Sequence, residues 1–203
     1  MKNLRRLVVS LAVLLVALLC LTATVSAAEI THSGTCGDNL TWTLDDEGTL
    51  TISGTGEMTD YAAGETPWYE MRLEIKQVII ENGVTTIGVN AFWNATNLTS
   101  ITIPDGVTSI GNHAVGSCET ITEIVIPDSV ISIGTSAFSY CTALTEITIP
   151  DSVTSLGERA FQDCFSLTKL TIPKSITNVS NYLFNNCSSL IEVILPDGTV
   201  SIG

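Results

Sequence analysis

The chain has 203 residues, of which 45% are hydrophobic and 14% are charged, and its formal net charge is −13. This balance supplies enough apolar side chains for a packed core and excludes an intrinsically disordered protein. The strong negative charge repels phosphate groups, so nucleic acids and anionic lipid surfaces are excluded as main partners.

Residues 1–28 have the order of features found in a secretory signal peptide. Basic residues in MKNLRR precede a nearly aliphatic run, Leu7–Leu21, and small residues then offer cleavage after Ala27 or Ala28. An uncleaved membrane anchor is the alternative, because a span needs about 20 apolar residues; lipid attachment at Cys20 is disfavoured by the bulky residue before it. No second apolar run follows, so we expect a secreted or cell-surface protein with no other membrane contact. Without the leader, five basic residues face 21 acidic ones, a net charge of 5 − 21 = −16.

Residues 29–74 are predicted to form an N-terminal cap that contains a β-hairpin. Apolar side chains alternate with polar ones on both sides of the turn sequence DDEG, which is the hairpin pattern. The alternating apolar residues are Leu40, Trp42, Leu44, Leu50 and Ile52.

Residues 50–77 are predicted to form a degenerate first coil. Leu50 lies 28 residues before Val78, five more than the period that follows, which leaves room for a loop around DYAAGE. In this alignment Trp68 and Tyr69 share columns with Ala91 and Phe92, and Ile75 shares a column with Leu98.

From Val78 onward the sequence repeats with a period of 23 residues and no insertion. Whole copies start at Val78, Ile101, Ile124, Ile147 and Leu170, and a partial copy starts at Val193. A fixed period of this length is typical of a solenoid, in which each coil buries the apolar side of its neighbours. The repeat domain is predicted to span residues 75–203. Because the last copy stops in mid-repeat at SIG, we expect the sequence to be a piece of a longer protein.

Each copy predicts two short strands joined by turns. The line EITIPDSVTSLGERAFQDC, residues 146–164, begins with strand alternation, and Pro150 ends that strand because proline cannot donate to a ladder. Residues 153–156 are predicted to form the second strand, and Gly157 turns the chain after it. Residues 160–164 are predicted to form one helical or 3-10 turn with its apolar side inward.

Two columns of this turn are predicted to form a ladder in the core. Their members are Phe92, Phe138, Phe161 and Phe184, with Val115 as an exception, and Cys118, Cys141, Cys164 and Cys187. For the cysteines we favour buried free thiols over disulfides, because side chains in register run parallel and a disulfide needs converging Cβ atoms. A metal site is the least favoured alternative, since the spacing is not that of a zinc site. Cys36 has no evident partner.

The line ITIPDSVTSLGERAFQDCFSL resembles the BspA-like, or Treponema-type, bacterial leucine-rich repeat. The resemblance covers residues 75–203, and the preceding segment resembles the N-terminal unit that often precedes these repeats. It implies an α+β, mostly β, leucine-rich-repeat solenoid with an N-terminal β-hairpin cap. It also implies export to the surface of an anaerobic or host-associated bacterium, where some family members are adhesins.

No arrangement of residues in the sequence predicts catalysis, a cofactor or a metal. His32 lies in a polar lead-in and His113 in a solvent column, so no nucleophile–base pair can be drawn. The aspartates that follow the prolines form a column with calcium-ligand chemistry, but Lys174 interrupts it and turn formation explains it. These aspartates are Asp105, Asp128, Asp151 and Asp197. We therefore expect a protein that is not an enzyme.

The outward residues of the first strand in each copy are predicted to line one broad sheet surface, called the binding face below. They are Ser100, Thr102, Glu123, Val125, Glu146, Thr148, Lys169, Thr171, Glu192 and Ile194. Wide regular surfaces of this kind bind extended partners through many weak contacts. The plain alternative is a face that is only solvated.

Two functions of different class follow from this organisation. The favoured one is a non-catalytic binding or adhesion module that holds an extracellular protein or glycan. The alternative is a structural or display arm of a larger multidomain secreted protein, including one with an enzyme domain beyond residue 203. An ice-binding threonine ladder is disfavoured, because glutamates interrupt its second column.

Overall fold

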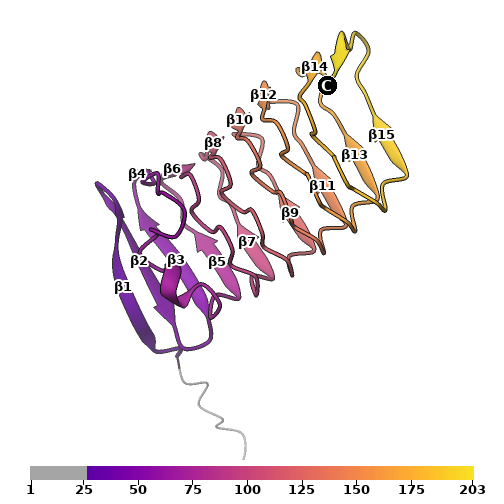
Figure 1. Cartoon of the computed structure of the whole chain (residues 1–203). Coiled ribbons are helices and arrows are strands. Elements are labelled where there is room, and N and C mark those ends of the chain that lie inside the picture. Colours follow the sequence, from indigo (N-terminus) through magenta and orange to yellow (C-terminus); the bar gives the residue numbers. More distant parts are fainter. Residues whose placement is uncertain (1–26) are drawn as a thin grey trace, which may run out of the picture.

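The computed structural model describes residues 27–203, which wind into an elongated row of coils (Figure 1). The predicted signal segment, residues 1–28, lies outside the described residues except for its last two. Within the described range, no helix is both long enough and apolar enough to cross a membrane.

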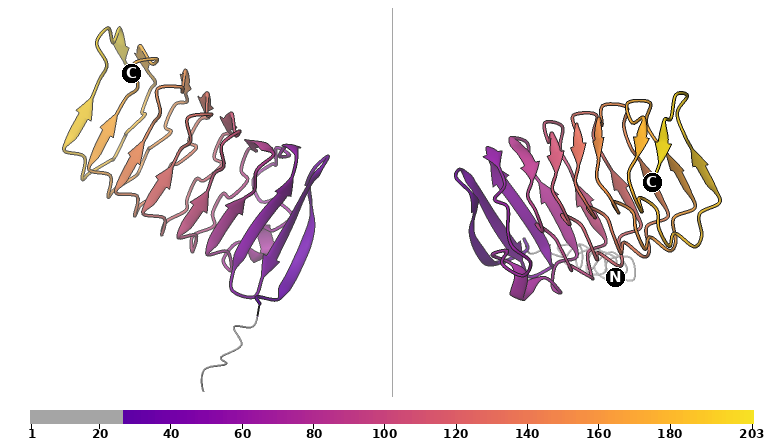
Figure 2. Two further views of the ribbon diagram at one scale, coloured as in Figure 1. Left: turned by 180° about the vertical axis from the view of Figure 1, so that it is seen from behind. Right: turned by 45° about the horizontal axis from the view of Figure 1, so that its top comes forward.

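Every coil contributes one strand to each of two sides of the solenoid, as both views in Figure 2 show. The first strands are β3 (Thr49–Gly54), β5 (Gln77–Ile80), β7 (Ser100–Thr102), β9 (Glu123–Val125), β11 (Glu146–Thr148), β13 (Lys169–Thr171) and β15 (Glu192–Ile194). The second strands are β4 (Gly56–Glu57), β6 (Val84–Ile87), β8 (Ser109–Ile110), β10 (Ser132–Ile133), β12 (Ser155–Leu156), β14 (Asn178–Val179) and β16 (Ser201–Ile202).

Successive coils are stacked in register. Ile147 pairs with Ile124 on the first-strand side, and Ile133 pairs with Ile110 on the second-strand side, each one period away. Their side chains point inward because alternate residues of a strand face opposite sides. The structure is therefore a mostly β solenoid with the 23-residue spacing that the sequence predicts.

Two antiparallel strands precede the first coil at the N-terminal end. They are β1 (Ile30–Gly37) and β2 (Leu40–Asp45), in a sheet of order β1-β2-β3-β5-β7. Strands β2 and β3 form a hairpin in which Trp42 faces Ile52 and Leu44 faces Leu50, with all four side chains buried. Strand β1 pairs along β2 with two register irregularities and is mostly exposed. The sequence did not predict β1.

The first coil has the predicted register but not the predicted aromatic columns. Leu50 pairs with Val78, as the 28-residue spacing requires. The Trp68 ring stacks on Phe92 with centroids 5.9 Å apart, and Tyr69 stacks on Trp93 at 6.3 Å. The alignment of Trp68 with Ala91 and of Tyr69 with Phe92 was therefore wrong by one position. The indole N–H of Trp68 donates to the Ala91 carbonyl at 2.8 Å, which holds the ring one position further along.

The helical or 3-10 turn predicted for every repeat is not confirmed. In the described part of the chain the helical structure is one 3-10 helix, η1 (Tyr69–Met71), in the first coil. In the repeats, alternate amides donate to the next coil: Phe161 N–H bonds the Leu183 carbonyl at 2.9 Å, while Gln162 N–H bonds Arg159 at 3.0 Å. Left-handed backbone at Arg159 (φ 57°) and Asp163 (φ 59°) interrupts helical geometry on both sides.

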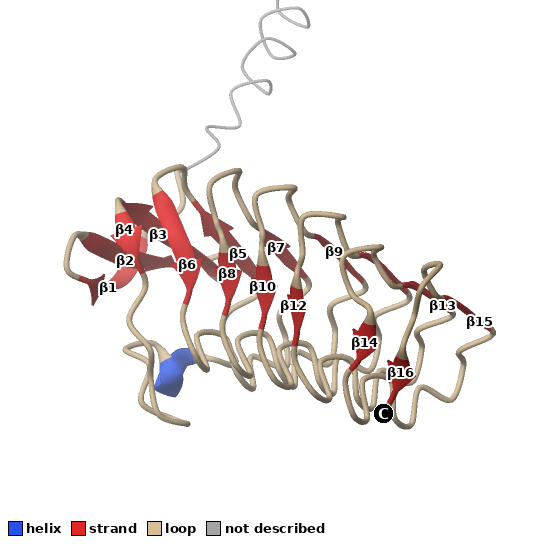
Figure 3. Cartoon of the chain, turned by 90° about the horizontal axis from the view of Figure 1, so that it is seen from above, coloured by secondary structure: helices blue, strands red, loops and turns tan. Residues whose placement is uncertain are grey.

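A glycine in each turn lets the second strands approach one another. The Gly157 amide donates to Ile133 and the Gly134 amide to Ile110, both across one coil. In the next coil Ser180 takes the glycine's place, and its hydroxyl bonds the Leu156 carbonyl at 2.5 Å. The ladder β4-β6-β8-β10-β12 ends there, and β14 pairs only with β16 (Figure 3). The first-strand pairing is interrupted at the same junction, between β11 and β13, and also between β7 and β9.

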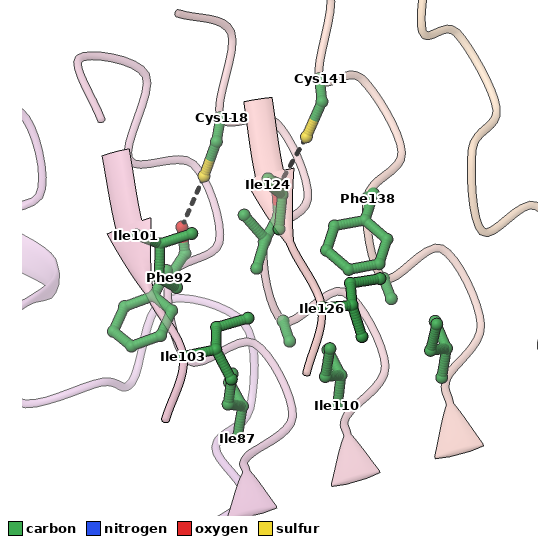
Figure 4. Close-up of a cluster of buried hydrophobic side chains, with 14 of the residues drawn as sticks. Ile87, Phe92, Ile101, Ile103, Ile110, Cys118, Ile124, Ile126, Phe138 and Cys141 are labelled. Carbon is green, nitrogen blue, oxygen red and sulfur yellow. Dashed lines mark hydrogen bonds between the residues drawn. The ribbon is translucent and has the colours of Figure 1, made fainter. Parts of the chain in front are cut away.

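The core is a set of apolar files that run along the solenoid. Figure 4 shows isoleucines of both strands with Phe92 and Phe138, and the Cys118 and Cys141 side chains at the other end of the coil. The phenyl rings of Phe138 and Phe161 stack with centroids 5.6 Å apart and an interplanar angle of 5°. Files of equivalent residues therefore carry the packing from one coil to the next.

Candidate binding face

The binding face is the outer surface of the first strands. All ten predicted residues are exposed, and the residue between each pair points inward and is wholly or partly buried. The register of β9 with β11 and of β13 with β15 places equivalent side chains side by side. The face consequently has two rows, which we call the charged row and the β-branched row. The charged row is Ser100, Glu123, Glu146, Lys169 and Glu192, and the β-branched row is Thr102, Val125, Thr148, Thr171 and Ile194.

The β-branched row extends further than the repeats predicted. Thr102 pairs with Ile79, Ile79 with Thr51, and Thr51 with Thr43, so the same outward row crosses the cap. Ile79 shares the column of Thr102 and could have been identified from the repeat alignment, whereas Thr43 and Thr51 were missed because the hairpin lies outside the repeat period. The strand alternation in residues 40–52 is the signal that identifies them.

Some charged side chains of the face form an ion pair and others do not. Lys169 forms an ion pair with Glu192, with 2.9 Å between Nζ and Oε2. Glu123 and Glu146 occupy facing positions of β9 and β11, and the described residues supply no ion pair to either carboxylate. Val125, on the same strand as Glu123, leaves 69% of its surface exposed. An aliphatic side chain and two unpaired carboxylates therefore lie together near the middle of the face.

The four repeat cysteines lie inside the solenoid and away from the binding face. Each thiol donates to the backbone carbonyl of the residue 26 positions earlier, for example Cys118 Sγ to Phe92 O at 3.3 Å and Cys141 Sγ to Val115 O at 3.2 Å (Figure 4). Cys164 and Cys187 repeat this bond at 3.2 and 3.1 Å. All five cysteines of the described residues are free thiols. The rings of Phe92, Phe138 and Phe161 are buried beside this file, and Phe184 is partly buried.

We expect these thiols to be unreactive while the chain is folded. Burial raises the pKa of Cys118 to about 12 and the pKa values of Cys36 and Cys187 to about 11, so thiolate is scarce near pH 8. Burial also raises the pKa values of Cys141 and Cys164. Titration with a thiolate-selective reagent should count under one thiol per folded chain within about ten minutes. After unfolding without reductant, a chain from which residues 1–28 have been removed should give a count of all five. A count that reaches five only after reduction would show disulfides instead.

The remaining candidate positions from the sequence are the two histidines and the aspartate column. His113 is half-buried with a left-handed backbone, and the exposed His32 ring nitrogen contacts the Thr31 hydroxyl. Among the described residues no group of three or more acidic, histidine or cysteine side chains is placed to hold a metal ion. Asp151 bonds Lys174 at 2.8 Å, which lowers the pKa of the carboxyl and raises that of the amine.

Two features of the surface were not anticipated from the sequence. An open polar trough with a volume of about 430 Å³ follows the second strands, and Thr86, Ser109 and Ser132 are among its lining residues. On the turn side, the buried Asp163 carboxylate accepts from Gln162 and Asn186, each at 2.8 Å, and bonds the Tyr140 hydroxyl, which raises the pKa of Tyr140. The column of Asp163 mixes residue types, so its alignment held no signal for this cluster. The hydroxyl column of Thr86, Ser109, Ser132 and Ser155 is the signal that could have identified the trough.

Comparison with known proteins identifies the repeats. Residues 109–203 match the model of the BspA type leucine rich repeat region, in six copies. A T. pallidum leucine-rich repeat protein (TpLRR) of known structure is 25% identical, with a TM-score of 0.62 and 83% of each chain covered. No curated protein matches the chain.

Two further solved structures share the fold at lower identity. A Bacteroides ovatus leucine-rich repeat protein is 22% identical, with a TM-score of 0.55, over 80% of this chain and 53% of that one. The pneumococcal vaccine antigen PcpA is 19% identical, with a TM-score of 0.56, over 84% of this chain and 51% of that one. The chain thus spans about half the length of these two proteins.

Proposed function

Residues 109–203 of this chain match the BspA type leucine rich repeat region, and from this premise we propose that the chain is an exported, non-catalytic module that binds an extracellular protein or glycan on its binding face. Proteins with this fold are generally surface or binding proteins and typically non-catalytic, which supports the proposal. The predicted signal segment, residues 1–28, supplies the route to the secreted or cell-surface location. Adhesion is the form of binding that fits a protein at that location.

One observation carries the proposal. The ten residues of the binding face stand exposed on five successive first strands, and strand pairing places them in register between β9 and β11 and between β13 and β15. Val125 and Ile194 are exposed aliphatic side chains of the β-branched row, and Thr148 and Thr171 lie between them in that row. A flat rigid surface of this kind loses little conformational entropy when a partner binds.

Blocking the face with bulky side chains tests the proposal. The variant Val125→Arg/Thr148→Arg changes two exposed positions of the β-branched row and should retain the fold. The matched control, Ser155→Arg/Asn178→Arg, adds the same charge at exposed positions of the second strands. Each protein is applied to arrays of purified extracellular matrix proteins and cell-wall glycans. A partner should bind wild type and control, and bind the blocked variant at least about tenfold more weakly.

The structural-arm hypothesis gives a different result in the same assay. The chain spans about half of two solved relatives, which supports a role as one part of a longer protein. For an arm that only spaces other domains, wild type, control and blocked variant should all leave the arrays unlabelled. Equal labelling by all three proteins would mean that another surface binds the partner, and it would contradict the assignment of binding to the binding face.

A further inference from the structure

Glu123 and Glu146 form an unfavourable pair within the binding face. They occupy facing positions of β9 and β11, and both are exposed. Neighbouring strands lie about 4.8 Å apart, and two like charges side by side at that spacing repel each other. One coil further, the same row places Lys169 beside Glu192 and forms an ion pair of 2.9 Å. The row can therefore hold an attractive pair, but at Glu123 and Glu146 it holds a repulsive one.

An exposed aliphatic group stands next to this pair. Val125 follows Glu123 on the same outward side of β9 and pairs in register with Thr148. Its 69% exposure is the largest among the apolar residues of the face. Lysine and arginine side chains combine an aliphatic stem with a cationic head, and they lay the stem on apolar surface while the head reaches a charge. Val125 with the two glutamates offers complementary chemistry for one such side chain.

We propose that the partner of the binding face is a polypeptide with a cationic segment, and that one of its lysine or arginine side chains lies over Val125 with its head between Glu123 and Glu146. This inference rests on the proposed function, because it names what the face holds. The charge of the chain, −13 overall, favours the approach of a cationic partner and opposes an anionic one. An arginine head can contact both carboxylates through its fork of N–H donors.

A binding titration tests the proposal with a defined probe. The probe is a fluorescent peptide of four Lys-Val units, compared with a Glu-Val peptide and with a chitosan oligomer, in about 50 mM and about 200 mM salt. We expect the Lys-Val peptide to bind, with weaker binding in the higher salt, and the Glu-Val peptide not to bind. Equal affinity for chitosan would overturn the choice of a polypeptide over a cationic glycan.

Matched variants assign the binding to the glutamate pair. Glu123→Gln/Glu146→Gln should weaken binding of the Lys-Val peptide by about tenfold, and Val125→Ser by a smaller factor. The control, Asp105→Asn/Asp128→Asn, removes two exposed charges from the turns and should change the affinity by less than about twofold. Equal losses in the pair variant and the turn variant would mean non-specific attraction by net charge and would overturn the proposal.

A stability measurement adds a second, independent readout. Glu123→Lys converts the repulsive pair into an attractive pair like Lys169 and Glu192, so the melting temperature should rise by about 1–3 °C. The same variant should no longer bind the Lys-Val peptide. A lower melting temperature would contradict the repulsive pair. The array experiment distinguishes the proposed binding function from the cationic partner. If Val125→Arg/Thr148→Arg abolishes capture of an array partner, the binding function stands. If the Lys-Val peptide then does not bind wild type, the cationic partner is refuted.

Discussion

Replacing Phe161 by alanine is expected to destabilise the folded chain by about 3–5 kcal/mol, because the substitution leaves a cavity in a closed file of side chains. The Phe161 side chain is fully buried, and its ring stacks on Phe138 at 5.6 Å. Its amide also donates to the Leu183 carbonyl and its carbonyl accepts the Cys187 thiol, so bonds to the next coil hold the backbone around the cavity in place. For a chain of this size the melting temperature should fall by roughly 10 °C.

Phe165→Ala is the matched control for this variant. Phe165 lies in the same coil but leaves 43% of its surface exposed. Its truncation removes little buried area, so we expect a change within about 0.5 kcal/mol. Thermal unfolding followed by circular dichroism compares the two. If Phe161→Ala and Phe165→Ala melt at the same temperature as wild type, the phenylalanine file does not stabilise the solenoid.

The effect should also be spatially limited. In a solenoid each coil contacts only its neighbours, so a local defect weakens two interfaces and leaves the distant ones intact. Hydrogen exchange should accelerate around Phe161 and Phe138 and stay near wild type in the hairpin β2–β3. Faster exchange everywhere would indicate one cooperative unit.

The repeat period made most of the fold predictable. Each alignment column has one physical role, so the register of Ile124 with Ile147 and the burial of Phe161 follow from the spacing alone. The turn was different, because its left-handed positions carry residues such as Arg159 and Asp163 in place of glycine. Asn and Asp tolerate this backbone, and they stand at Asn90 and Asp163. Arg159 and Tyr140 fill the same two columns, however, and gave no sign of the backbone that excludes a helix.

The N-terminal end shows a second limit of sequence reasoning. Strand β1 has the sequence ITHSGTCG, which lacks an apolar alternation, and it is placed by backbone pairing with β2. Backbone hydrogen bonds are common to all residues, so such an edge strand leaves little pattern in the sequence. The shift of Trp68 has a related cause, because the indole bond to Ala91 depends on a loop without a repeat partner.

The candidate face was predictable in position but not in its charge pairing. Strand alternation identifies Glu123, Glu146 and Lys169 as outward residues, and the period places them in one row. Which glutamate Lys169 contacts depends on side-chain direction, and the structure gives this contact to Glu192. The structure was therefore needed to show that Glu123 and Glu146 lack a basic partner among the described residues, on which the cationic-partner proposal depends.

The second large effect is expected for Gly157→Ala. The backbone angles at position 157 do not require glycine. Glycine is required there because a Cβ atom would not fit. A Cβ atom there would lie 2.4 Å from the backbone carbon of Gly134 and 2.4 Å from the amide nitrogen of Thr135. Backbone atoms cannot move aside as a flexible side chain does, so the coils must separate. We expect a loss of about 1–3 kcal/mol, as for other overpacked sites.

The natural replacement at Ser180 indicates what this separation does. Ser180 occupies the glycine position of the next coil, and its hydroxyl donates to the Leu156 carbonyl. The pairing between β12 and β14 is interrupted there. Gly157→Ala should therefore cause a similar interruption of strand pairing between β10 and β12. Amide exchange of Ser155 and Leu156 should accelerate with it. The reverse variant, Ser180→Gly, should slow exchange of Asn178 and Val179, because it lets the second strands close across this junction.

Gly116→Ala separates crowding from the loss of glycine itself. A Cβ atom at Gly116 would meet the Trp93 side chain at 3.3 Å and a carbonyl oxygen at 3.4 Å, contacts that small shifts relieve. Alanine also restricts the unfolded chain, which favours folding by about 0.4–1 kcal/mol where the site tolerates it. We therefore expect Gly116→Ala to be near neutral while Gly157→Ala is clearly destabilised. Similar melting temperatures for the two variants would mean that close approach of the coils does not explain the glycine column.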